Sequence, residues 1–381
     1  MTLEALLMDA SPLISSQDRL HMAHAFRLAR RAFGRTSPNP MVGAVLVKNG
    51  KIIGQGWHRR AGLPHAEIEA LRAATEDPCG ATLYVTLEPC CTHGRTPPCT
   101  DAIIAAGIKR VVAAALDPNP AHCGNGFKIL QKASVSVCHG LMAGRESKLN
   151  QAFRHWIVHR TPFVTVKAAM SLDGKIAART GQSKWITSPS ARACGMSLRA
   201  AADAILVGVN TIVKDDPSLT LRRPGFKHKS LHRIVLDPSA RIPLQSRVLT
   251  DLFAPLTTIV VTAAAPASRL AALQRRVRVL KAPQRHGAID LAWLLQTLGR
   301  DQVSSLLVEG GGETNASFLL QGFAHRVAFF YAPLVIGGRD APKAVAGPGL
   351  PGLASSITLR DPRWRRLGPD ILLTANAAPP T

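Results

Sequence analysis

Apolar and polar residues in the first part of the chain follow helix and strand periods in turn. Apolar residues recur at helical spacing over residues 18–33, and Gly34 is expected to end that helix. Asn49-Gly50 separates two β-rich runs, which is typical of a tight hairpin. Further elements are predicted as a helix at 64–74, a strand at 81–87, a helix at 98–106 and a strand at 108–116. Strands that alternate with helices indicate an α/β layer fold.

The same alternation starts again in the second part of the chain. Predicted strands lie at 162–170, 202–209, 232–238, 257–262 and 304–309, and predicted helices at 189–200 and 313–320. The apolar run at 324–338 is expected to end the regular structure. A chain of 381 residues is about right for two domains.

Charged and polar residues precede Thr161-Pro162, so the domain boundary is placed near residues 145–162. We expect an N-terminal extension at 1–17, a first domain at 18–150, a linker at 151–161, a second domain at 162–375 and a frayed tail at 376–381.

The cysteines and the N-terminal residues indicate a reducing compartment. Seven cysteines are an odd number, and four of them lie within residues 79–99, which fits reduced thiols with a metal role better than a disulfide framework. The N-terminal residues are acidic rather than basic before their apolar positions, so no secretory signal is expected. No apolar run reaches the length of a transmembrane helix. We therefore expect a cytoplasmic protein with no membrane partner.

The charge balance is strongly basic, with 47 Lys and Arg against 24 Asp and Glu and a net charge of +23. This excess indicates either a solvated basic surface or an attraction for phosphorylated ligands or nucleic acid. Aromatic residues make up only 5% of the chain, and no Lys/Arg run is interleaved with them as in a stacking platform. We therefore expect no nucleic-acid partner.

His65, Cys90 and Cys99 have the residue types and setting of catalytic zinc ligands. His65 and Glu67 form an H-x-E pair at a predicted helix start, Cys90 follows a strand, and Cys99 begins the next helix. Catalytic zinc takes three protein ligands and keeps one position for water. Eight residues separate the two cysteines, where the P-C-x-x-C deaminase signature has two, so the loop must fold back. The alternative is a solvent-facing histidine and two buried, reduced cysteines.

This ligand set predicts hydrolytic removal of an amino group from a small heteroaromatic ring. Zinc lowers the pKa of its bound water toward neutrality, and the resulting hydroxide attacks the ring carbon. Glu67 is placed to carry the proton from water to a ring nitrogen and then to the leaving amine. Two other functions are weighed against this one: a zinc-dependent deaminase of nucleic-acid bases, and a non-catalytic zinc-stabilised binding module.

A series of motifs, in this order, resembles the family of bifunctional deaminase–reductases of riboflavin biosynthesis. The motifs lie at 37–45, 65–67, 86–90, 94–103, 117–120, 167–177, 183–187, 215–220, 308–311 and 332–338. The resemblance implies a cytidine-deaminase-like three-layer domain followed by a dihydrofolate-reductase-like α/β domain. It also implies Zn²⁺ and NADPH as cofactors, a phosphorylated pyrimidine as substrate, and a homo-oligomer, with dimers common. The eight-residue cysteine spacing is normal in this family.

The resemblance further implies two successive reactions. A phosphoribosylamino-diaminopyrimidinone is deaminated hydrolytically, and NADPH then reduces the ribosyl group of the product to a ribityl chain. Asn39, His58 and Arg95 match substrate positions of the deaminase, and a guanidinium suits a phosphate. Two residues after the first zinc cysteine the family usually has histidine, whereas this chain has Thr92, followed by His93. Either His93 takes that role or a substrate contact is lost.

The reductase half carries weaker signals of its own. Gly310-Gly311-Gly312 is either a phosphate cradle or a tight strand-to-helix turn, Trp185 fits a core, and Lys167 fits a side chain that reaches solvent. By resemblance, the cofactor contacts are Ala169, Trp185, Thr211, Asp215, Gly311 and Gly312, and the substrate contacts are Lys167, Ser183, Arg199, Leu219, Arg222 and Glu309. Asp215 or Glu309 is a candidate to assist ring opening of the ribosylamine.

Overall fold

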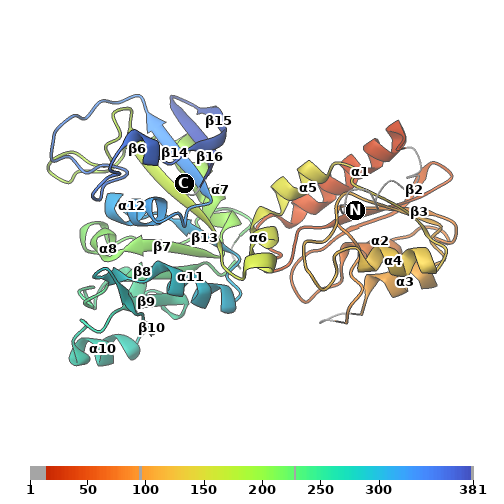
Figure 1. Cartoon of the computed structure of the whole chain (residues 1–381), viewed down its shortest axis with the longest axis horizontal. Coiled ribbons are helices and arrows are strands. Elements are labelled where there is room, and N and C mark those ends of the chain that lie inside the picture. Colours follow the sequence, from red (N-terminus) through yellow and green to blue (C-terminus); the bar gives the residue numbers. More distant parts are fainter. Residues whose placement is uncertain (1–13, 94–96, 227–228, 379–381) are drawn as a thin grey trace. The chain divides into compact units, whose positions relative to one another are not determined.

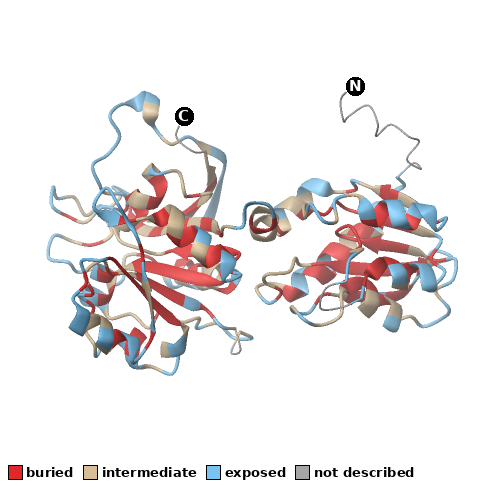
Figure 2. Cartoon of the chain, turned by 60° about the horizontal axis from the view of Figure 1, so that its bottom comes forward, coloured by how far each residue is buried: buried red, intermediate tan, exposed pale blue. Residues whose placement is uncertain are grey.

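The chain forms two compact units, Met1–His159 and Arg160–Thr381, in a computed structural model. The structure describes residues 14–93, 97–226 and 229–378. Figure 1 shows the elements of each unit, and Figure 2 shows that buried residues concentrate on the sheets and the helix faces turned toward them. No helix among the described residues is long and apolar enough to cross a membrane.

Unit 1 is built on a five-stranded sheet in the order β2-β1-β3-β4-β5. Its strands are β1 (Gly43–Lys48), β2 (Lys51–Trp57), β3 (Thr82–Val85), β4 (Arg110–Ala113) and β5 (Ser136–His139). β1 pairs antiparallel with β2 and β3, whereas β3, β4 and β5 are parallel. Asn49 and Gly50 connect β1 to β2, both with positive φ, which confirms the predicted hairpin.

Helices cover both faces of this sheet (Figure 1). α1 (Ser16–Ala29) packs on one face, and α2 (Ala66–Arg72), α3 (Cys99–Ala105) and α4 (Asn125–Lys132) pack on the other. The period of two explains why β1 is apolar from Ala44 to Val47. Ala44 and Leu46 share a core with the α2 residues, while Val45 and Val47 share one with the α1 residues. A sheet with two apolar faces requires three layers.

Two short helices, α5 (Ala143–Leu149) and α6 (Gln151–His159), complete unit 1. The range 151–161, which we expected to be a linker, therefore holds a helix for most of its length. Trp156 and Ile157 of α6 are buried, and Phe153 packs against the sheet core. These apolar residues are spaced as one helical face among polar neighbours, a pattern that the polar composition of the segment obscured.

Unit 2 is built on a nine-stranded sheet in the order β10-β9-β8-β7-β13-β6-β14-β16-β15. Its strands are β6 (Phe163–Ser171), β7 (Ala204–Gly208), β8 (His232–Leu236), β9 (Thr257–Val261), β10 (Arg278–Lys281), β13 (Ser305–Val308), β14 (Arg326–Ala332), β15 (Leu359–Leu367) and β16 (Asp370–Ala377). Neighbours are parallel from β10 to β14, and β16 and β15 add two antiparallel strands. β11 (Gln284–Arg285) and β12 (Ala288–Ile289) pair separately.

Both faces of the parallel strands are covered by helices. α11 (Leu291–Arg300) and α12 (Gly312–Leu320) pack on one face, and α8 (Val209–Asp215), α9 (Arg247–Thr250) and α10 (Ala267–Gln274) pack on the other. α7 (Pro189–Ala201) packs through Ala191 against Ala328, Phe330 and Leu372 of β14 and β16. The predicted α/β fold class is confirmed for both units.

The regular structure does not end at 324–338, so that expectation was wrong. β15 and β16 follow, and β16 runs to Ala377, into the range expected as a frayed tail. β15 is mostly exposed and contains Pro362. A strand at a sheet edge tolerates proline and charged residues on its free side, so it lacks the apolar alternation that marks a buried strand.

Candidate functional site

His65, Cys90 and Cys99 converge in unit 1. His65 Nδ1 lies 3.4 Å from Cys90 Sγ and 3.3 Å from Cys99 Sγ. The three ligand atoms lie within 4.8 Å of one another, and no other group of His, Cys, Asp or Glu side chains in the described ranges has metal-site spacing. One imidazole nitrogen and two sulfurs are donors that zinc prefers. The predicted ligand set therefore fits a zinc ion.

Close packing between α2 and β2 holds His65 and Glu67 in place. His65 is the N-cap of α2, and Glu67 lies in its first turn. A Cβ at Gly54 would stand 2.4 Å from Ala70 O, and a Cβ at Gly56 would stand 2.5 Å from Ala70 N. A side chain at either glycine would push away the helix that carries both residues.

The ionisation of Glu67 and Cys90 suits zinc chemistry. Burial raises the pKa of Glu67 to about 7, against the opposing charge of His65. The hydrogen bond with the Cys99 side chain lowers the pKa of the Cys90 thiol to about 4, against the effect of burial. The Cys99 backbone N–H also donates to Cys90 Sγ, at 3.4 Å. A thiolate ligand and a carboxyl that exchanges protons near neutral pH are the forms that a hydrolytic zinc site uses.

Asn39 and His58 lie beside the ligand set. The rings of His58 and His65 meet edge to face with centroids 5.2 Å apart. His58 Nδ1 lies 3.1 Å from Pro64 O, and His58 Nε2 lies 3.2 Å from Asn39 Nδ2. Because a carbonyl only accepts, Nδ1 carries the hydrogen and Nε2 accepts from the Asn39 amide. Burial lowers the pKa of His58, which favours this neutral form.

A residue that the sequence did not single out fixes the segment after Asn39. Asn150 Oδ1 accepts from Met41 N at 2.8 Å, and Asn150 Nδ2 donates to Met41 O at 3.1 Å. Glu146 accepts a further hydrogen bond from Asn150 and one from Arg154. The contact joins residues that are 109 positions apart, so no local sequence pattern could have indicated it.

The loop between the two cysteines is described only in part. Arg95 lies outside the described residues. Thr92 and His93 are exposed. Thr92 Oγ1 lies 3.4 Å from Nε2 of His122, a residue that the sequence analysis did not select.

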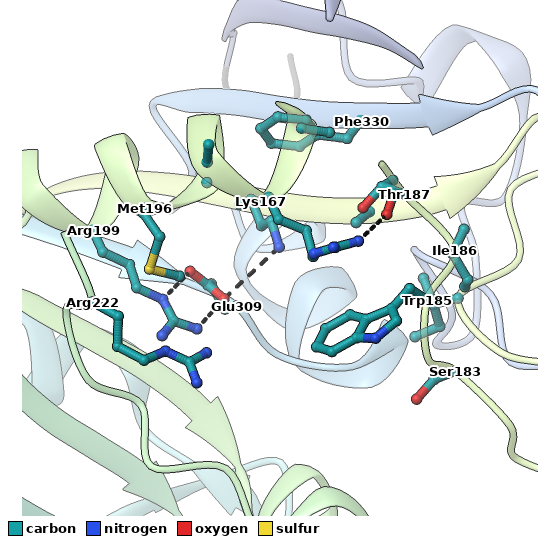
Figure 3. A pocket seen from close by; sticks show the side chains of 16 residues that line it. Lys167, Ser183, Trp185, Ile186, Thr187, Met196, Arg199, Arg222, Glu309 and Phe330 are labelled. Atoms are coloured by element: carbon teal, nitrogen blue, oxygen red, sulfur yellow. Dashed lines mark hydrogen bonds and ion pairs between the residues drawn. The ribbon is translucent and has the colours of Figure 1, made fainter. Parts of the chain in front are cut away.

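Unit 2 contains a cavity of ≈ 370 Å³ (Figure 3). The residues predicted for the reductase that line it are Lys167, Ala169, Ser183, Trp185, Arg199, Arg222 and Glu309. Lys167 and Ala169 lie two apart on β6 and so share a face of the sheet, opposite Ala328 and Phe330 of β14. The volume is within the range of small-molecule and cofactor sites. The fold therefore brings residues that lie far apart in the sequence together at one cavity.

Glu309, directly after β13, contacts two cationic side chains of the cavity (Figure 3). Arg199 Nε and Nη2 donate to its two oxygens, each at 2.9 Å, and Lys167 Nζ lies 3.8 Å from Oε2. Burial favours a higher pKa for Glu309, but the charges on Arg199 and Lys167 outweigh burial and lower the pKa to about 2. The carboxylate is therefore ionised at neutral pH, the form that pairs with both cations.

The other predicted reductase residues lie outside the lining of this cavity. They are Leu219, which is buried, Thr211 and Asp215 of α8, Gly311 at the N-cap of α12, and Gly312, its first residue. A Cβ at Gly312 would stand 2.3 Å from Lys343 O, so the backbone there has no room for a side chain.

Helix α7 contributes several lining residues that the sequence analysis missed, among them Arg192 and Met196. Arg192 and Met196 line the cavity together with Arg199. The guanidinium of Arg192 lies 4.5 Å from the ring centroid of Trp185, whose surface is 68% exposed. Positions 192, 196 and 199 share one face of a helix, so helical spacing from Arg199 could have indicated both residues.

Comparisons with known proteins agree for both units. A family model described as "RibD C-terminal domain" matches residues 162–373, and one described as "Cytidine and deoxycytidylate deaminase zinc-binding region" matches residues 15–115. Riboflavin biosynthesis protein RibD of Aquifex aeolicus is 43% identical over 361 residues, covering 95% of this chain and 99% of the relative. RibD of Escherichia coli is 40% identical over 365 residues, covering 94% and 98%.

Solved structures give the same result. RibD of Acinetobacter baumannii (form 1) superposes with a TM-score of 0.85 at 35% identity, covering 95% of this chain and 99% of that chain. A Thermotoga maritima structure described as a diaminohydroxyphosphoribosylaminopyrimidine deaminase/5-amino-6-(5-phosphoribosylamino)uracil reductase has a TM-score of 0.78 at 32% identity, with the same coverage. The predicted pair of domains is confirmed, and a reductase domain has no part in either alternative function. The chain belongs to the RibD family of riboflavin biosynthesis, in which a zinc-binding deaminase domain is fused to an NADPH-using reductase domain.

Proposed function

We propose that unit 1 deaminates 2,5-diamino-6-(5-phosphoribosylamino)pyrimidin-4(3H)-one and that unit 2 reduces the ribosyl group of the resulting 5-amino-6-(5-phosphoribosylamino)uracil to ribityl. The name of the Thermotoga maritima relative gives these two activities for that protein. The observation that carries the proposal is the convergence of His65, Cys90 and Cys99 in the unit that buries Glu67. Three protein ligands leave one position for water, as hydrolytic zinc sites require.

In unit 1, metal binding and proton transfer are carried out by different side chains. A zinc ion, when bound, supplies the nucleophile, because zinc lowers the pKa of water toward neutrality. Glu67 takes one proton from the water and gives it to the ring nitrogen as the C–O bond forms. It then takes the second proton from the hydroxyl group on the ring carbon and gives it to the amine, which leaves as ammonia when the C–N bond breaks. Its pKa, raised by burial to about 7, suits transfer in both directions.

Asn39 and His58 orient the pyrimidine ring in this proposal. Asn39 donates from Nδ2 to His58, so its amide is held with the carbonyl oxygen available to accept from an amino group of the substrate. Arg95, assigned by resemblance alone, meets the substrate phosphate, and His93 is the second residue of that loop assigned to the substrate.

In unit 2 the cavity holds the ribosyl group against the cofactor. NADPH, when bound, supplies the hydride, and the protein orients the reacting groups. Ala169 and Trp185 lie on the cofactor side, together with Thr211, Asp215, Gly311 and Gly312, which the resemblance assigns. Lys167, Ser183, Leu219 and Glu309 are assigned to the substrate.

Arg222 is better placed than Arg199 to bind the substrate phosphate. Arg199 donates twice to Glu309 and once to Thr220 O, so three of its five N–H groups are engaged within the protein. Arg222 is exposed and lines the same cavity (Figure 3). In this proposal Arg199 holds Glu309 in position, and Arg222 meets the phosphate.

We also propose a cytoplasmic homodimer. The free cysteines of the described residues support a reducing compartment. The dimer is assigned by the family resemblance alone. Sedimentation equilibrium of the intact chain tests the dimer, and a mass of one chain at micromolar concentration would reject it.

The decisive experiment supplies the diaminopyrimidinone with and without NADPH and identifies the products by mass. Without NADPH we expect ammonia and a product in which one amino group is replaced by oxygen. With NADPH the product should gain two further hydrogens. Removal of zinc by a chelator should stop the first reaction but leave the reduction of added deaminated substrate intact. Absence of ammonia from the zinc-loaded protein would reject the proposed deamination.

A further inference from the structure

An exposed tryptophan of the cavity in unit 2 lies on a segment that forms no helix or strand. Trp185 lines the cavity and is 68% exposed. The segment that carries it joins β6 to α7 without an element of its own. Figure 3 shows Trp185 and Thr187 on one side of the cavity and Arg222 on the other. Because no backbone ladder holds this segment, side-chain contacts must fix the orientation of the indole.

Arg192 of α7 makes two contacts with this segment. Its Nη1 donates to Thr187 O at 2.7 Å, a hydrogen bond that a dashed line marks in Figure 3. Its guanidinium lies 4.5 Å from the ring centroid of Trp185, which is within the range of a cation–π contact. One side chain therefore holds both the backbone before α7 and the ring that faces the cavity.

The start of α7 gives Arg192 a fixed support. Ser188 is the N-cap of the helix, and its side chain accepts from Ala191 N at 3.3 Å. Ser188 N donates to the buried carboxylate of Asp370 at 2.8 Å, which ties the helix start to β16. Ala191 packs against the sheet in a small apolar core. Arg192 thus extends from an element whose position the sheet determines.

We infer that Arg192 is a positioning residue of the reductase, which holds the Trp185 indole in the orientation that a planar ring of NADPH packs on. The inference rests on the proposed function, which places Trp185 on the cofactor side of the cavity. Aromatic rings pack in offset stacks or edge to face, so the orientation of the indole decides which contact the cofactor makes. Arg192 acts through Trp185, because its guanidinium is already engaged by the Thr187 carbonyl and the ring.

The test measures the Kd of the full chain for NADPH, from the fluorescence of the cofactor, and then kcat for reduction of the deaminated product. Arg192→Met removes the charge but keeps a long apolar side chain on the helix. It should raise Kd about fivefold, the size of a lost cation–π contact, and change kcat less than about twofold. Arg192→Lys should recover most of the affinity, because an ammonium also binds over an indole.

A double-variant cycle separates positioning from direct contact. In the Trp185→Leu background, Arg192→Met should weaken NADPH binding no further, because the ring that Arg192 holds is absent. If the two losses multiply, Arg192 contacts the cofactor itself and the inference is overturned. Arg326→Met is the matched control, since it removes a guanidinium that lies 5.3 Å from the Phe163 ring, outside the cavity lining. Its Kd should equal that of the unaltered chain, and equal weakening in both single variants would overturn the inference.

An unchanged Kd in Arg192→Met would also overturn the inference. If that variant does not fold, Arg192→Gln, which keeps a polar side chain, takes its place with the same expectation and the same rejecting result. Because the Kd is measured with NADPH alone, it does not depend on the reaction. A chain that binds NADPH but does not reduce the deaminated product would reject the proposed reaction, while the variants would still decide the role of Arg192. A chain that does not bind NADPH would overturn both.

Discussion

The two units build their sites in different ways. In unit 1, His65, Cys90 and Cys99 come from three short motifs and meet at a single point. In unit 2, the cavity is lined from β6, residues 176, 183 and 185–187, α7, residue 222, β14 and the residue after β13. A metal centre fails when one donor is lost, whereas a cavity spreads binding over many contacts. The comparison predicts that single substitutions at the site of unit 1 abolish most of its activity, whereas single substitutions at the cavity of unit 2 have smaller effects that differ from residue to residue.

Loss of a metal ligand should give the largest effect. We expect Cys90→Ala to lose zinc and to lower deamination more than about 1000-fold, because the nucleophile depends on the metal lowering the pKa of water from 15.7 to about 7. Metal analysis and ammonia release measure both effects. Cys79→Ala, which alters an exposed cysteine outside the ligand set, is the matched control and should retain zinc and activity. Equal damage in both variants would contradict the assignment.

Glu67→Gln should separate metal binding from proton transfer. We expect normal zinc content and a fall in kcat for deamination of about 10²–10⁴-fold, the usual contribution of a positioned general acid–base. Reduction of the deaminated product by the same variant should be unchanged. If the variant loses zinc, Glu67 supports the metal and the role assigned to it is wrong.

The metal centre could be predicted from the sequence because zinc ligands are recognised by their residue types and their spacing. His65 and Glu67 lie on one helix start, and two cysteines follow at short range, so few folds could use them otherwise. The contacts of Asn150 with Met41 and of Glu88 with Gly126 could not be predicted in this way. Each depends on how distant segments pack, and an isolated Asn or Glu has many other uses.

Removal of the Glu309 carboxylate, whose side chain is 11% exposed, should act first on stability. Glu309→Gln leaves Arg199 and Lys167 without their anionic partner, and breaking a buried ion pair costs about 3–5 kcal/mol. Calorimetric unfolding of the intact chain measures the loss. Glu313→Gln, at an exposed carboxyl four residues on, is the control and should unfold like the unaltered protein. No difference between the two variants would contradict the importance of the buried pair.

The lowered pKa of Glu309 predicts that the stability of the folded chain depends on pH. The pKa of Glu309 is lowered from 4.5 to about 2 in the folded chain, so the unfolded chain binds the proton first as the pH falls. The contribution of Glu309 to stability is complete above pH 4.5 and is lost as the pH falls toward 2. Over that interval, the unfolding free energy of the unaltered chain should fall more steeply than that of Glu309→Gln. Parallel curves would show that the carboxylate is not preferentially ionised in the fold.

Sequence periodicity predicted the buried strands well and the polar edges poorly. β1 and β13 are short apolar runs, and their burial on both faces explains that composition. β15 was missed because its exposed arginines and Pro362 carry no alternation. Arg192 was missed although it shares a helix face with Arg199, because charged residues at helical spacing are also typical of a solvated surface.

We expect the smallest effect from a substitution of Trp185, an exposed residue that lines the cavity of unit 2. Trp185→Leu removes the ring under the Arg192 guanidinium and should raise KM for NADPH about tenfold, within the range of a cation–π contact and its apolar surface. Trp364→Leu, another exposed tryptophan of unit 2, is absent from the cavity lining and should leave KM unchanged. Many contacts are expected to contribute to cofactor binding. If Trp185→Leu raised KM for NADPH more than 1000-fold, this cavity would depend on one residue, as the metal centre does. The contrast drawn between the two units would then be wrong.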